Sequence, residues 1–334
     1  MRVSRRVFLG GAGASAVGIT LPPTAQAIAA APRSVVSDDV NPLTHFIEMK
    51  KVFMDSDNLF GPARVINAVH QQLDLMQQLR QSWRGADRQR LLQVQTQYAD
   101  LLGWLYQDSG DFPASRHWVD RSLEWSHLAR DSQTAAFILA RRSQLAADMG
   151  NPADAIDAAE AARATARPNT RIAAIAATFA GHGYALEGDA DSVSRSYDQA
   201  RELLLSGETD HESAYGLCFN EGYLDVYRAR SLAALGRFLP AADIFQTAIE
   251  GLPEGYWRDT GVYLAWQARA YAGGREAEQA AELGLHALVV ACETGSARII
   301  VELAHLDDAL AQWRAVPKIR EFRAALTDVI PHQA

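Results

Sequence analysis

Few residues of this chain stand in patterns that perform catalysis or bind metal. None of the nine histidines belongs to a His-Glu-x-x-His motif, in which two imidazoles one turn apart hold zinc, and His211-Glu212 stands alone in a polar loop. Asp189 and Asp191 open like a calcium-binding loop, but the glycine and glutamate required at its sixth and twelfth positions are missing. The Gly-x-Ser-x-Gly turn that exposes a nucleophilic serine is also missing. The sequence therefore predicts neither a catalytic centre nor a metal site.

The glycine and cysteine patterns do not indicate a cofactor. Gly11, Gly13 and Ala16 are spaced as in a dinucleotide-binding turn, but no strand-like segment precedes them. Cys218 and Cys292 are the only cysteines and lie far apart, which excludes a disulfide framework and a cysteine-rich zinc site. Both fall on predicted helices, where we interpret them as packed thiols. No cofactor is predicted.

Composition predicts a folded protein and narrows its partners. Hydrophobic residues make up 48% of the chain and charged residues 22%, a balance that can bury a substantial core. The formal net charge is −8, and no long run of lysine or arginine interrupts the acidic balance. Such a surface has no electrostatic footprint for a phosphate backbone, so we expect no direct binding to nucleic acid.

Residues 1–31 have the features of a leader. They begin with a cationic stretch and continue as a Gly/Ala-rich run that is too short to span a membrane. The segment Ser-Arg-Arg-Val-Phe-Leu resembles the twin-arginine export signal, and the matching residues include Arg5, Arg6, Phe8 and Leu9. This resemblance implies export and removal of the leader. The alternative is a disordered arm that stays attached to a cytoplasmic protein.

Residues 32–59 mix proline, serine, aspartate and scattered apolar residues without sustained periodicity. We interpret them as a linker with one short helix around residues 43–54. The remaining residues, 60–334, show helical periodicity and almost no strand-like alternation, so they predict an all-α fold. Four glycine-containing breaks, spaced 38 to 48 residues apart, each separate two amphipathic helices: Gly110, Gly150, Gly188 and Gly236.

The sequence around these breaks resembles the tetratricopeptide repeat (TPR) family. The clearest copy matches the motif at Leu102, Gly103, Tyr106, Gly110, Phe112 and Leu123. In this motif small residues, here Gly103 and Ser115, let the two helices of a repeat approach closely. The resemblance implies a right-handed superhelix of four or five antiparallel helix pairs with capping helices at both ends. On the C-terminal cap, Glu302 is expected to face water.

A closer resemblance covers residues 59–111 and 278–303. These segments look like the TPR half of actinobacterial helix-turn-helix transcriptional regulators, which implies a regulatory or sensory role. A DNA-binding domain of three or more helices should precede the repeats, but the sequence ahead of them is rich in glycine, alanine and proline. Sequence-specific DNA binding is therefore not carried over. Some members also carry an Arg-Arg-x-Phe-Leu segment before the repeats, which weakens the export interpretation.

The TPR resemblance places ligand-facing side chains on the first helix of each repeat, along a concave wall. The matched positions are Asp100, Trp104, Gln107, Asp108, Gln144, Asp148, His182, Tyr223, Arg230 and Arg269. Acidic groups come first along the chain and arginines last. This order predicts an extended peptide ligand with opposite charges at its two ends. Trp104 and Tyr223 are the candidate aromatic anchors.

Three functional interpretations follow. The first is a non-enzymatic module that binds a peptide or protein segment, in a regulatory context. The second is the cytoplasmic ligand-sensing half of a transcriptional regulator that acts through a separate DNA-binding partner. The third is an enzyme with an unrecognised site. A chaperone co-factor is disfavoured, because Asp100 stands where a carboxylate-binding lysine is expected.

Overall fold

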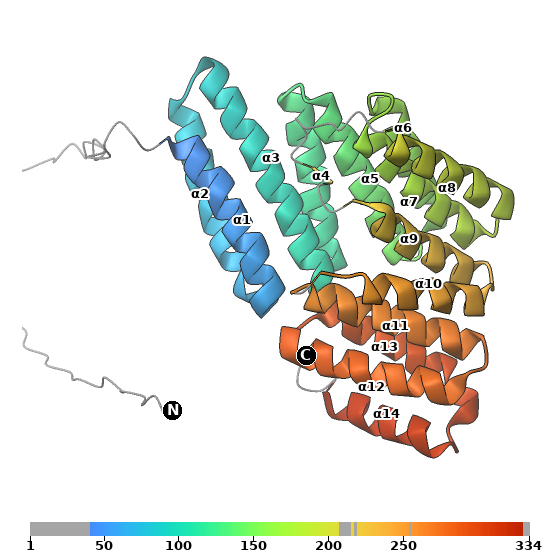
Figure 1. Cartoon of the computed structure of the whole chain (residues 1–334). Helices are drawn as coiled ribbons and strands as arrows, with labels where there is room; N and C mark the ends of the chain where they lie inside the picture. The colour runs from blue at the N-terminus through green and yellow to red at the C-terminus, as the bar shows by residue number, and fades with distance from the viewer. Residues whose placement is uncertain (1–40, 207–214, 217–218, 254, 330–334) are drawn as a thin grey trace, which may run out of the picture. The chain divides into compact units, whose positions relative to one another are not determined.

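The computed structural model describes residues 41–206, 215–216, 219–253 and 255–329. All regular structure in these ranges is helical (Figure 1), which confirms the all-α prediction. The residues of the export-signal interpretation, Arg5, Arg6, Phe8 and Leu9, lie outside the described ranges, as do His211-Glu212 and Cys218. That interpretation therefore stays a prediction.

Five consecutive helix pairs form the repeats. Their bounds are α3 (Gly85–Asp108) with α4 (Phe112–Leu128), α5 (Ser132–Asp148) with α6 (Pro152–Thr165), α7 (Arg171–Glu187) with α8 (Ala190–Leu205), α9 (Glu221–Ala234) with α10 (Phe238–Glu250), and α11 (Trp257–Gly273) with α12 (Ala277–Thr294). The two helices of each pair pack against each other, the first helices α5, α7, α9 and α11 pack against one another in chain order, and the first pair meets α5 through α4. The helices therefore stack as a TPR-like superhelix of antiparallel pairs.

The four predicted corners join the two helices of a pair. Gly110, Gly150, Gly188 and Gly236 each have a positive φ, between 72° and 84°, which glycine adopts without the steric cost of a Cβ atom. In the first three corners an aspartate or asparagine follows. Its side chain accepts a hydrogen bond from a backbone N–H in the first turn of the next helix. The conformation of each of these corners therefore depends on residues that are adjacent in the sequence.

The close helix approach expected of the first repeat is also present. A Cβ atom on Gly103 would lie 2.9 Å from Cγ2 of Val119 in α4, closer than two carbon atoms normally approach. The Ser115 hydroxyl donates a hydrogen bond of 2.7 Å to the carbonyl oxygen of Gly103. The two small residues of the motif therefore hold α3 and α4 together.

The N-terminal end differs from the prediction. Residues 42–60 form one continuous helix, α1 (Pro42–Phe60), which Asn41 caps and which packs against α3. The linker interpretation of residues 32–59 is therefore wrong from residue 42 onward, and the compact unit begins at residue 41 rather than 60. Only a few apolar side chains of α1, such as Phe46 and Phe53, are buried, so its periodicity is weak in the sequence. A short 3-10 turn (Pro62–Arg64) leads into α2 (Ile66–Ser82).

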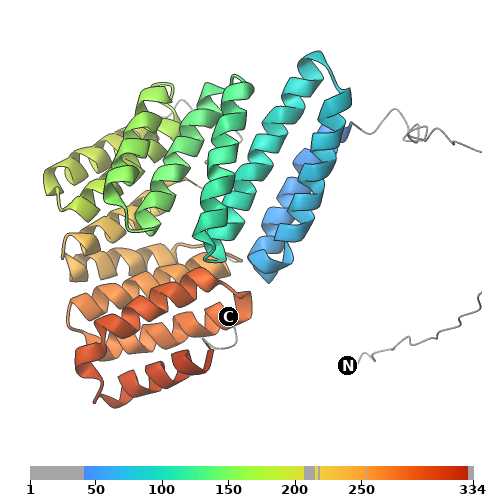
Figure 2. The ribbon, with the colours of Figure 1, turned by 180° about the vertical axis from the view of Figure 1, so that it is seen from behind.

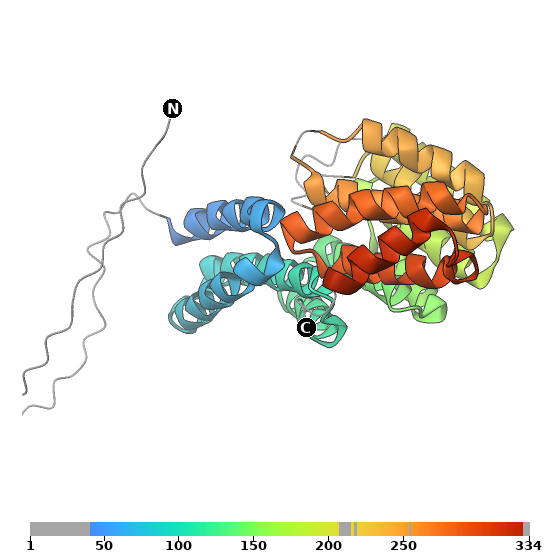
Figure 3. The same ribbon diagram turned by 90° about the horizontal axis from the view of Figure 1, so that it is seen from below.

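At the C-terminal end, two more helices extend the alternating stack of first and second helices. Helix α13 (Ala297–Ala309) packs against α11, and α14 (Pro317–Val329) packs against α12 (Figure 2). At the other end of the repeats, α1 ends beside the start of α11 and the end of α12 (Figures 1 and 3). The N-terminal helix α1 therefore contacts the last repeat directly.

Candidate functional site

All ten predicted ligand-facing residues lie on the first helices α3, α5, α7, α9 and α11, and they belong to one set of contacts. We call this set the inner network. It consists of the ten predicted residues with Asp57, Arg141, Tyr227, Arg258, Trp266, Arg298 and Glu302. The structure brings the ten predicted residues together, and their side chains contact one another rather than lining an open surface.

Asp148 lies at the centre of the inner network. Its carboxylate accepts hydrogen bonds from Nε2 of Gln107 at 2.7 Å and from Nη2 of Arg230 at 2.9 Å, and Nη2 of Arg298 lies 3.9 Å away. Burial alone would raise the pKa of Asp148, but the guanidinium groups of Arg230 and Arg298 outweigh it and lower the pKa. One carboxylate thus holds side chains from three other helices, α3, α9 and α13.

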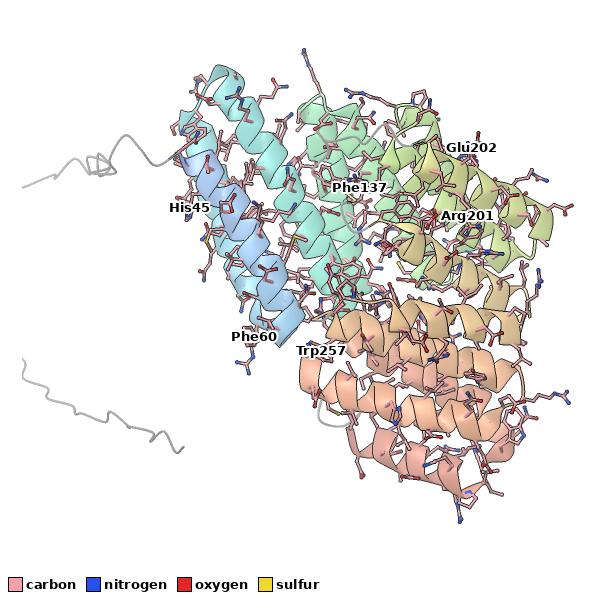
Figure 4. The ribbon with its side chains drawn as sticks, viewed as in Figure 1. His45, Phe60, Phe137, Arg201, Glu202 and Trp257 are labelled. Atoms are coloured by element: carbon pink, nitrogen blue, oxygen red, sulfur yellow. The ribbon has the colours of Figure 1, made fainter. Side chains whose placement is uncertain are left out.

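Arg258 joins the first and last parts of the chain. Its Nη1 atom donates to the carboxylates of Asp57 at 2.7 Å and of Asp108 at 2.8 Å, and its Nη2 atom also contacts Asp57. Asp57 lies in the last turns of α1, Asp108 ends α3, and Arg258 begins α11. Figure 4 labels Phe60, the last residue of α1, and Trp257, the first residue of α11. Two carboxylates share one guanidinium, and burial, the largest cause, raises the pKa of Asp57.

Arg141 connects three of the predicted residues: Gln107, Gln144 and Asp100. It donates to Oε1 of Gln107 at 3.1 Å, contacts the side-chain oxygen of Gln144, and lies 3.6 Å from the carboxylate of Asp100. Gln144 in turn donates to the hydroxyl of Tyr227 in α9. Burial raises the pKa of Asp100 and outweighs the opposing effect of Arg141. Helices α3, α5 and α9 are therefore linked by side-chain polar contacts.

Two tryptophans lie beneath the arginines of the inner network. The guanidinium carbon of Arg230 is 4.2 Å from the ring centre of Trp266, and that of Arg298 is 5.1 Å from the same ring. Trp104 has Arg141 at 5.1 Å and Arg298 at 5.5 Å. A guanidinium on a partly desolvated indole face is stabilised by about 0.5–2 kcal/mol. The aromatic rings thus fix the positions of the arginines.

The predicted segregation of charge is not present. Asp108 pairs with Arg258, and Asp148 pairs with Arg230 and Arg298, so the acidic residues of the early helices are neutralised by arginines of the late ones. The linear motif gives the face of each helix but not the curvature of the stack, which brings distant repeats together. Gln107, Asp108, Gln144 and His182 are also buried rather than exposed along a free wall.

The remaining predicted residues join the network at its edges. His182 lies edge-on to Tyr227, with ring centroids 5.8 Å apart, and Tyr223 stacks on Tyr227 at 5.1 Å. Arg269, whose side chain is 42% exposed, pairs with Glu302 of α13. The expectation that Glu302 faces water on a cap is therefore wrong, because α13 continues the inner wall.

Sequence reasoning missed several members of the inner network, although a signal for most of them was present. Arg141, Tyr227 and Trp266 each lie three residues before a predicted position, which places them one turn away on the same helix face. Arg298 lies four residues before Glu302 in the same way. Extending the predicted stripes of α5, α9 and α11 by one helical turn would have found Arg141, Tyr227 and Trp266, whereas Glu302 was expected to face water and so did not point to Arg298. Asp57 had no such signal, because α1 belongs to no repeat.

Because the imidazole of His182 is buried, we expect the stability of the fold to depend on pH. Burial, with a smaller contribution from Arg230, lowers its pKa to about 3, while Asp148 and Glu302 oppose this. An unfolded histidine titrates near pH 6.5, so unfolding takes up a proton at any pH between these values. The contribution of His182 to the free energy of unfolding is fully present above about pH 6.5. It is lost, by about 1.4 kcal/mol per pH unit, as the pH falls toward the folded pKa.

We expect His182→Gln to remove this slope between pH 6.5 and 5 in urea denaturation, because the amide does not titrate. His45→Gln, at an exposed position of α1, is the matched control and should keep it. Parallel pH dependences for the wild type and His182→Gln would contradict the expectation.

Neither a metal site nor a membrane span is found in the part of the chain that the structure describes. No three histidine, cysteine, aspartate or glutamate side chains there are grouped to hold a metal ion. No helix in those ranges is long and apolar enough to cross a bilayer.

Comparisons with known proteins agree with this fold. No family model and no curated protein sequence matches the chain. Among solved structures, the Rap protein complexed with competence and sporulation factor is similar over 86% of this chain and 86% of its own, with a TM-score of 0.52 and 13% identity. BtubC (BKLC) from P. vanneervenii covers 70% of this chain and 92% of its own, with a TM-score of 0.45 and 15% identity. At 13% identity, the likeness to Rap shows the shared helical-repeat fold and nothing more.

Proposed function

We propose that the protein is a non-enzymatic binding module that recognises a peptide or protein segment on its inner wall, in a regulatory context. The observation that carries this proposal is the inner network itself, which gathers charged and aromatic side chains from consecutive repeats. A repeat core needs only apolar contacts to be stable, whereas buried ion pairs contribute little net stability for their desolvation cost. Their concentration on one wall supports a role in recognition. The Rap structure, solved with competence and sporulation factor, supports such a role for this kind of fold.

The chemistry of the wall restricts the ligand. Both signs of charge are present and already paired, so a ligand that brings only acids or only bases leaves part of the network without a partner. A segment with at least one acidic and one basic side chain can take the place of one partner in each of two internal ion pairs, so that every charge of the network stays paired. Nη1 of Arg230 is buried and has no hydrogen-bond partner among the described residues. This nitrogen can therefore donate a hydrogen bond to the ligand.

Capture from native lysate tests this proposal. The immobilised protein should retain a partner whose yield falls at least tenfold in Trp104→Ala and in Arg269→Ala, because each removes a contact from the inner wall. Arg269 is partly exposed, so its loss should leave the fold intact, which circular dichroism will verify. Arg320→Ala, at an exposed site on α14, is the matched control. Equal yields of the same partners from all variants would refute the proposal.

A further inference from the structure

A cleft between α12 and α14 lies outside the inner network. It is an open hollow of about 680 Å³, and Figure 1 shows α14 lying alongside α12. Its floor is apolar and consists of Leu285, Leu288 and Val289 from α12 with Ala325 and Val329 from α14. We call it the α12–α14 cleft. Val289 is 57% exposed, although a valine at the contact between two helices is normally covered.

The rim of this cleft is acidic. Glu282 and Glu293 from α12 and Glu321 and Asp328 from α14 line it, and all four are exposed. Among the described residues that line the cleft, only Lys318 is a lysine or an arginine. Its Nζ atom already lies 3.4 Å from the carboxylate of Glu321. Three carboxylates therefore have no lysine or arginine partner within the lining. An occupant with positive charges around an apolar face matches this surface.

A second copy of the chain does not match it. A symmetric contact through the same cleft would bring two acidic rims together, and like charges across an interface are costly. The occupant is therefore expected to be a different protein.

The shape of the floor favours a helix. Along α12 the lining residues extend from Glu282 to Glu293, roughly 16 Å at 1.5 Å per residue, which is about three helical turns. Its apolar side chains recur at three- and four-residue spacing, so they form a ridge that a third helix can pack against. We propose that the α12–α14 cleft docks an amphipathic helix of a partner protein. The apolar face of that helix lies on Val289 and its lysine or arginine side chains meet the acidic rim.

The test uses two synthetic 14-residue peptides. One has leucines at helical spacing on one face and lysines on the other, and the second has glutamates in place of the lysines. Fluorescence anisotropy should show the lysine peptide binding at least tenfold more tightly than the glutamate peptide. Val289→Asp and the double variant Glu293→Lys/Glu321→Lys should each weaken its binding at least tenfold. These residues are exposed, so the fold should tolerate the changes.

Matched controls separate this cleft from other surfaces. Leu239→Asp and Glu250→Lys change an exposed leucine and an exposed glutamate of α10 and should leave the affinity unchanged. Trp104→Ala and Arg269→Ala should also have no effect, so failure here is distinct from failure of the proposed function. Equal binding of both peptides, or unchanged binding to the cleft variants, would overturn the proposal. A self-association that Val289→Asp abolishes would assign the cleft to a second copy instead.

Discussion

Replacing Arg258 with alanine is expected to lower the free energy of unfolding by about 3–5 kcal/mol. The side chain of Arg258 is 8% exposed, and its guanidinium is shared by the carboxylates of Asp57 and Asp108, which come from α1 and α3. Its removal leaves two buried carboxylates without their arginine partner. Urea denaturation measures the loss. Hydrogen exchange should show reduced protection in α1, because α1 loses its ion pair with α11.

Two further variants distinguish a lost ion pair from general damage. Arg258→Met combined with Asp57→Asn and Asp108→Asn removes all three charges, so it should recover much of the stability. Arg320→Ala, at an exposed arginine of α14, should change it by less than about 0.5 kcal/mol. A loss in Arg258→Ala no larger than in Arg320→Ala would mean that the ion pairs of Arg258 with Asp57 and Asp108 contribute nothing to stability.

Asp148→Ala is expected to have an effect of similar size, again about 3–5 kcal/mol. It leaves the buried guanidinium groups of Arg230 and Arg298 without their carboxylate and removes the acceptor for the Gln107 amide. The pKa of Asp148 is lowered in the folded state. Its contribution is therefore present above its unfolded pKa of about 3.9 and is lost as the pH falls toward the folded pKa.

This pH dependence supplies the decisive measurement for Asp148. The difference in unfolding free energy between wild type and Asp148→Ala should be largest near neutral pH and should shrink below about pH 4. Asp198→Ala, at an exposed position of α8, is the matched control and should lie close to the wild type throughout. A difference that does not change with pH would show that the effect is steric rather than electrostatic.

The repeat architecture could be predicted because its signals are local. Gly110, Gly150 and Gly188 are each followed by aspartate or asparagine, and the left-handed turn and the N-cap depend on these adjacent residues alone. The close contact of Gly103 with Val119 follows in the same way from a motif within one repeat. Helix α1 gave a weaker signal, because it belongs to no repeat and few of its side chains are buried.

Ten residues of the inner network could be predicted, but their pairing could not. The face of each first helix follows from the motif, and all ten predicted residues take part in the network. The contact between Arg258 and Asp57 joins residues 201 positions apart, which depends on the curvature accumulated over several repeats. No spacing in the linear sequence encodes that curvature. The same limitation explains why the predicted separation of acids from arginines was wrong.

The most direct test of the central claim, that the inner wall receives a partner's segment, is site-specific photo-crosslinking in native lysate. A photoreactive phenylalanine analogue at position 104 reports on the inner wall. The same analogue at position 52 reports on the outer, exposed side of α1, where Val52 is 51% exposed. We expect position 104 to give a crosslinked segment that carries both acidic and basic residues, and position 52 to give none. Crosslinks at position 52 alone, or none at position 104, would contradict the claim.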